Sequence, residues 1–200
     1  MMVSFMRYCK NSKPHLFFLS ALLLCIPLVL SADVYAEGSN LQIKLAELVP
    51  IEGAYALNAD FDVNFSSDVE VALNKSVPLS FLIEFQITSP QRYWFDDEIV
   101  SASMRVSLSY HALSRQYLIK RGAHQQTFAT LQEAKDELAQ LHGWKVVDKS
   151  LLKKGEIYNA ALRIRLDQSR LPKPLQVDAL NSEDWAMVSE RYLWIPAFAF

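Results

Sequence analysis

Apolar and polar side chains alternate along most of the chain after residue 40. From Tyr55 to Phe65 every second residue is apolar, and Asn or Asp fills most of the positions between them. A period of two residues is typical of a β-strand with one buried and one solvated face. The same alternation predicts further strands over residues 41–49, 79–88, 100–110, 117–120, 124–128, 158–167 and 189–195.

Two segments break the alternation and predict short helices. Ser67–Glu70 and Thr130–Glu133 each place a hydroxyl residue three positions before a glutamate, which is the spacing of a capping box. Apolar residues at helical spacing extend the second helix over residues 131–141, with Gly143 just past its end and His142 placed to complement its dipole. Antiparallel strands joined by two short helices predict a mainly β fold. It would be an antiparallel β-sandwich, for which an immunoglobulin-like arrangement is one option.

The first 36 residues carry a different pattern, that of a secretory signal peptide. Three cations precede an apolar stretch over residues 16–30, which is shorter than the ~20 residues that a membrane-spanning helix needs. Small or modest side chains at positions 34 and 36 then predict cleavage after Ala36. The sequence thus predicts a signal peptide over residues 1–36 and a single β-sandwich domain over residues 37–200. The alternative is an uncleaved segment 16–30 that anchors the domain to the inner membrane.

Cleavage would change the composition of the working protein. It would remove both cysteines, Cys9 and Cys25, and leave a domain with no disulfide and no thiol chemistry. That domain would carry 17 Lys and Arg against 21 Asp and Glu, a net charge of −4. Mild acidity without a basic cluster argues against nucleic acid as a partner. We therefore expect a periplasmic domain that contacts the membrane only if its N-terminal segment stays attached.

Several unusual motifs occur in a fixed order along the part after residue 36. They are Ala46–Pro50, Tyr93–Asp96, Leu108–Tyr117, Thr127–Ala134 and Leu171–Pro174. In this combination the chain resembles the exported proteobacterial proteins of domain of unknown function family 4390. The resemblance implies a Gram-negative envelope protein with a link to a membrane sensor kinase, and it brings no catalytic or ligand residue with it.

Few residues carry recognisable chemistry. His111, His124 and His142 each stand alone, with no second His or Cys at metal-ligand spacing. The carboxylates of Asp96–Glu98 lack the alternating oxygens and the glycine of a calcium loop. We therefore predict no metal site and no cofactor. His111, which follows a strand, is interpreted as a structural histidine, and an envelope hydrolase that uses it as a base is the alternative.

The loop at Arg92, Tyr93, Trp94 and Phe95 is the candidate binding surface. Four large side chains in a loop between two strands cannot all face a core, and exposed aromatics beside an arginine are typical of binding surfaces. The competing interpretation is that Trp94 or Phe95 closes the end of the sandwich.

These observations predict a function class and leave one further fold open. No Gly-x-Ser-x-Gly elbow and no phosphate-cradling glycine loop occurs, so no catalytic residue is predicted. We expect a non-enzymatic binding or accessory module whose partner is a protein or an envelope ligand. A small outer-membrane β-barrel is a further interpretation, because aromatic residues alternate at the end of the chain, at Tyr192, Trp194, Phe198 and Phe200.

Overall fold

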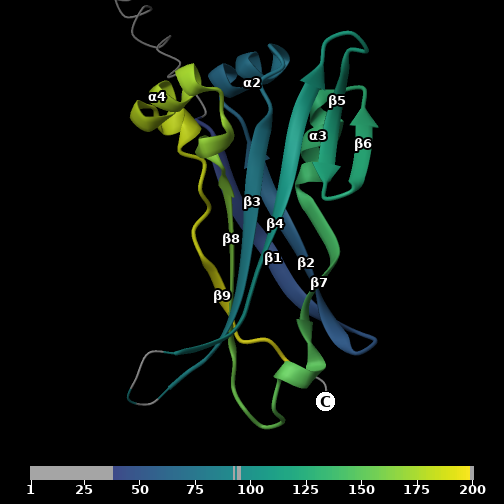
Figure 1. Cartoon of the computed structure of the whole chain (residues 1–200), viewed down its shortest axis with the longest axis vertical. Helices are drawn as coiled ribbons and strands as arrows, with labels where there is room; N and C mark the ends of the chain where they lie inside the picture. The colour runs from purple at the N-terminus through teal and green to yellow at the C-terminus, as the bar shows by residue number, and fades with distance from the viewer. Residues whose placement is uncertain (1–37, 92, 94–95, 199–200) are drawn as a thin grey trace, which may run out of the picture. The chain divides into compact units, whose positions relative to one another are not determined.

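The alternating segments form two antiparallel β-sheets (Figure 1). The computed structural model describes residues 38–91, 93 and 96–198, so the predicted signal peptide and its cleavage site at Ala36 lie outside the described residues. The first sheet has the order β1 (Asn40–Ile51), β2 (Ala54–Asn64), β7 (Gln140–Asp148). The second has the order β6 (His124–Phe128), β5 (Gln116–Arg121), β4 (Asp97–His111), β3 (Leu79–Ser89), β8 (Asn159–Leu166), β9 (Tyr192–Trp194). The predicted mainly β fold with antiparallel pairing is confirmed.

Short turns connect β1 to β2, β4 to β5 and β5 to β6, and they fix the register of these pairs. β1 and β2 form a hairpin in which Ile51 lies opposite Ala54. Gly53, in the turn between them, has a φ of +69°, a left-handed conformation that glycine adopts without a steric penalty. β3 and β4 pair in the same manner, from Leu79 opposite Leu108 to Ser89 opposite Asp97.

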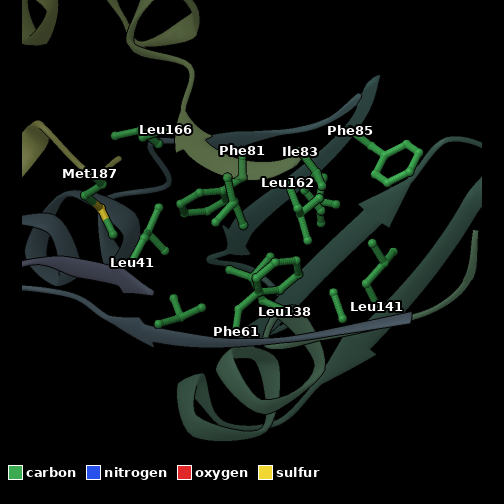
Figure 2. Packing of buried hydrophobic residues seen from close by; sticks show 14 of the residues in the cluster. Leu41, Phe61, Phe81, Ile83, Phe85, Leu138, Leu141, Leu162, Leu166 and Met187 are labelled. Atoms are coloured by element: carbon green, nitrogen blue, oxygen red, sulfur yellow. The ribbon is translucent and has the colours of Figure 1, made fainter. Parts of the chain in front are cut away.

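The core lies between the two sheets (Figure 2). Phe81, Ile83 and Leu162 come from the six-stranded sheet and face Phe61 of the three-stranded sheet, and each is at most 3% exposed. Burying one such side chain contributes about 1.5–3 kcal/mol, which makes this interior the main source of stability. The sandwich arrangement follows from these two apolar faces.

Three α-helices lie among the described residues: α2 (Ser67–Asn74), α3 (Leu131–Leu138) and α4 (Lys173–Asn181). The capping box of α3 is confirmed, because the Thr130 hydroxyl accepts from the Glu133 amide at 3.2 Å and the Glu133 carboxylate accepts from the Thr130 amide at 3.4 Å. The capping box predicted for α2 is wrong. Its N-cap is Ser66 rather than Ser67, and no side-chain hydrogen bond caps this helix. α4, which begins after Pro172, adds a third helix to the two that were predicted.

The predicted helix over residues 131–141 ends early. α3 ends at Leu138 and β7 begins at Gln140, because Leu141 pairs with Ala59 in the first sheet. Gly143 takes a φ of +68° within the strand, and its N–H donates to the side-chain oxygen of Asn58 at 2.9 Å. His142 is therefore an exposed strand residue and does not lie at a helix end, as predicted.

The last strand is also shorter than predicted. Only Tyr192–Trp194 of residues 189–195 form β9. Ser189, which precedes this strand, contacts β8 through its side chain, since the Ile164 N–H donates to Ser189 Oγ at 3.0 Å. The described strands form two sheets with free edges, β1 and β7 in one and β6 and β9 in the other. This arrangement does not support the closed barrel of the third interpretation.

None of the helices that the structure describes is long and apolar enough to cross a bilayer.

Candidate functional site: a cleft between the sheets

The aromatic loop predicted as a binding surface is described at one position. Tyr93 is 90% exposed, as a residue on a binding surface would be. Arg92, Trp94 and Phe95 lie outside the described residues. The loop therefore stays a prediction.

His111 ends β4 and begins an exposed turn. Its Nδ1 lies 3.1 Å from the hydroxyl of Ser114 and also accepts from the Ser114 N–H at 3.4 Å. Both contacts are local, and among the described residues no carboxylate forms a hydrogen bond or an ion pair with this ring. The histidine thus has the environment of a turn residue, and its use as a catalytic base stays a prediction.

The acidic residues Asp97 and Glu98, which follow the aromatic loop, accept hydrogen bonds from glutamine side chains. Gln91 donates to Asp97 at 2.8 Å, and Gln86 donates to Glu98 on the outer face of the six-stranded sheet. Within the described part of the chain, no group of three or more His, Cys, Asp or Glu side chains is placed to hold a metal ion.

The fold builds a different hollow, which we call the sheet cleft. It has a volume of about 460 Å³ and opens between the edge strand β7 of the first sheet and strands β4, β5 and β6 of the second. Its lining residues are Met104, Ile119, Arg121, His124, Gln126, Glu137, Leu141, His142, Gly143, Trp144 and Lys145. Small-molecule and peptide sites in proteins have volumes of about 300–1,000 Å³, so the cleft is large enough for such a ligand.

Apolar side chains form the floor of the sheet cleft. Ile119 and Leu141 are each 2% exposed and belong to the core, while Met104 and Trp144 are half-buried and pack against it. A methionine and a tryptophan that stay partly accessible offer an adaptable apolar contact and a large flat one.

Arg121 is the anchored cation of the cleft. Its Nη1 donates to the Glu137 carboxylate at 2.8 Å, and its Nη2 donates to the backbone oxygens of Glu137 and Gln140, the latter at 2.6 Å. Burial lowers the pKa of Arg121, the charge of Glu137 raises it, and an arginine stays protonated at neutral pH in either case. Its Nε is buried and has no hydrogen-bond partner among the described residues.

The remaining rim of the cleft is polar and mostly basic. His124, His142 and Lys145 are exposed at its mouth, and Lys145 forms an ion pair of 2.7 Å with Asp148. The two histidines are isolated in the sequence. They line one cleft because β6 and β7 belong to different sheets, a relationship that spacing along the chain does not reveal.

The sequence matches a family model over residues 38–195, described as a domain of unknown function (DUF4390). The chain belongs to this family. The match spans the strands of both sheets and all three described helices, so it covers the sheet cleft as a whole. No curated protein and no solved structure matches the chain.

In this DUF4390 domain the lining of the sheet cleft combines apolar and basic side chains. An apolar floor favours an apolar group of a ligand, and a basic rim favours an acidic group beside it. Among the described residues no Ser, Thr or Cys lines the cleft, and the one carboxylate they contribute, that of Glu137, is paired with Arg121.

Proposed function

We propose that this protein is an exported, non-enzymatic binding module of the cell envelope and that the sheet cleft is its binding site. The observation that carries the proposal is the half-buried pair Met104 and Trp144 on the floor of an open cleft, beneath a charged rim. A partly exposed apolar surface in a concave, polar-rimmed site is the usual form of a ligand or partner site.

We propose a non-enzymatic role because of the residues that line the sheet cleft. A nucleophilic mechanism needs a nucleophile within hydrogen-bond reach of a base, and the described part of the chain contributes no hydroxyl or thiol side chain to the cleft that holds His124 and His142. Metal-assisted chemistry needs a group of ligands, and in the described lining these two histidines and the paired Glu137 are the available ligand side chains.

The location in the periplasm rests on the signal-peptide pattern of residues 1–36. An accessory role beside a membrane sensor follows from the resemblance described above. The partner would be a protein or an envelope ligand that also contacts this sensor.

A comparison of variants in a native envelope extract tests the proposal. Trp144→Ala removes the flat apolar contact of the cleft, and His142→Glu reverses the charge preference of its rim. Val71→Glu, on the exposed side of α2, is the matched control, because Val71 is 50% exposed. We expect both cleft variants to lose a partner that the wild type and the control retain, with cooperative thermal unfolding in all four proteins.

The same experiment separates the cleft from the aromatic loop. Trp94→Ala would remove the partner if Arg92–Phe95 forms the surface instead. A partner list that none of the cleft variants changes would rule out the cleft as the binding site.

A further inference from the structure

β4 is longer than the strand that covers one of its edges. It pairs with β3 from Asp97 to Leu108, but β5 covers only Val106–His111. Residues 97–105 therefore have one backbone edge with no ladder partner among the described residues, and we call this the open edge. Figure 1 shows β4 continuing past the end of β5.

The other free edges of the two sheets carry features that discourage pairing. β1 has a bulge at Lys44 and a proline at position 50. The register of β7 shifts twice, β6 has five residues, and β9 has three. Bulges, prolines and short length are the common devices that protect an edge strand. The open edge pairs regularly with β3 from Val100 to Arg105 and holds no proline, so it lacks these devices over that stretch.

The open edge is closed at one end. The β5–β6 turn, at Gly122 and Ala123, lies beside β4 where β5 stops, and it lines a second hollow of about 660 Å³ together with Ser103 and Arg105. This hollow shares Met104, Arg121 and His124 with the sheet cleft. A strand added in line with β5 would therefore reach the β5–β6 turn and have to end there or leave the sheet.

Cations gather at this closed end. Arg105 and Lys120 lie on the outer face of the sheet, while Arg121 and His124 line the cleft side. Asp167 pairs with Arg105 at 3.4 Å and Glu137 pairs with Arg121 at 2.8 Å. For Lys120 the described residues provide no ion-pair partner, so the closed end keeps a positive charge that a carboxylate would neutralise.

We propose that the open edge of β4 binds the C-terminal segment of a partner protein as an added strand parallel to β4, with its terminal carboxylate at the basic closed end. The inference rests on the proposed binding function of the sheet cleft, which takes the apolar side chains of the same segment. Main-chain hydrogen bonds to an edge supply affinity in this mode, and alternate side chains supply specificity. The small side chains of Ser101, Ala102 and Ser103 leave the backbone of β4 accessible to such a strand.

A peptide library tests the requirement for a carboxylate. Random heptapeptides are attached to a support through their N-termini, one set with free carboxylates and a second set with C-terminal amides. We expect the purified protein to select sequences with apolar residues at alternate positions from the first set only. Amidation of a selected peptide, or Lys120→Glu in the protein, should weaken binding about tenfold, the effect of losing one charge-assisted contact. Lys154→Glu, the same change at an exposed lysine outside both hollows, should leave the affinity unchanged.

Hydrogen exchange tests the strand itself. A selected peptide should slow the exchange of backbone amides within residues 99–105 and leave the free edge of β1 unchanged. An empty selection, or equal binding of amidated peptides, would overturn the inference. So would a self-associated protein in which a second copy, rather than peptide, protects these amides.

Two outcomes keep this inference apart from the proposed function. If peptides bind and perturb Trp144 without protecting β4, the sheet cleft binds and the added strand is wrong. If no peptide binds and the cleft variants also leave the envelope partners unchanged, both proposals fail.

Discussion

Glu84 on β3 lies directly opposite Arg163 on β8, and one of its carboxylate oxygens accepts from both Nε and Nη2 of that arginine, at 3.0 and 2.8 Å. Nη2 of Arg165 lies 3.4 Å from the other oxygen. Partial burial raises the pKa of Glu84, but the hydrogen bonds and charges of the two arginines lower it further, so the pKa lies below its ordinary value. This cluster joins two central strands on the outer face of the six-stranded sheet.

Glu84 should make the free energy of unfolding depend on pH in the acidic range. Because its pKa is lower in the folded than in the unfolded protein, its contribution is present above the unfolded pKa of about 4.3 and is lost as the pH falls through the folded pKa. The groups are about one-third exposed, so we expect Glu84→Gln to cost about 1 kcal/mol at pH 7. Urea unfolding at pH 7 and at pH 3 measures this, and the difference from wild type should shrink at the lower pH. Glu52→Gln, in the exposed β1–β2 turn, is the control; an equal loss there would contradict the assignment.

Phe81 should be among the most sensitive positions of the core. Its side chain is 0% exposed and its ring stacks on Phe65 with the centroids 6.0 Å apart. Phe81→Ala would leave a cavity between the sheets, and such truncations cost about 3–5 kcal/mol. Denaturant unfolding checks the value. Leu193→Ala, at an apolar position that is 67% exposed, should change stability by less than about 0.5 kcal/mol.

The alternating segments predicted the fold well, because a strand with one buried face has apolar residues at every second position of its sequence. Phe81, Ile83 and Phe85 are buried, and Leu82 and Glu84 between them are partly exposed, as the period of two requires. The prediction failed where pairing between distant segments decided the structure. Leu141 continues the apolar spacing of α3, yet it belongs to β7 because β2 pairs with it.

The site was harder to predict than the fold for the same reason. Met104, Arg121, His124 and Trp144 come from four strands, and none of them belongs to a motif that the sequence displays. Half-burial of Met104 and Trp144 would have been the only signal, and it depends on how far the two sheets separate beside β7. The large residues of the aromatic loop are adjacent in sequence and form a visible motif, whereas the cleft residues are dispersed along the chain.

Export should produce a protein that begins at Glu37. The expected evidence is the intact mass of the protein released from the periplasm by osmotic shock. Ala36→Phe places a bulky side chain where the peptidase reads a small one and should block processing, so that the chain stays with the inner membrane. Ala32→Phe is the matched control and should leave the cut in place. A protein that begins at Asp33 would show that the peptidase cuts after Ala32 instead, and a wild-type chain of full mass would favour the anchored alternative.

His111→Ala distinguishes a structural histidine from a catalytic one. The ring Nδ1 accepts from the amide of Ser114 and forms a hydrogen bond with its hydroxyl within an exposed turn, and losing such bonds costs about 0.5–1.5 kcal/mol. We therefore expect a melting temperature lower by a few degrees, and Ser114→Ala should produce part of the same decrease because it removes one of these contacts. Hydrolysis of a panel of chromogenic esters, glycosides and phosphates should be at background for wild type and variant alike. An activity that His111→Ala abolishes at unchanged melting temperature would establish the hydrolase in place of the binding module, because a base that contributes only to catalysis leaves the turn intact.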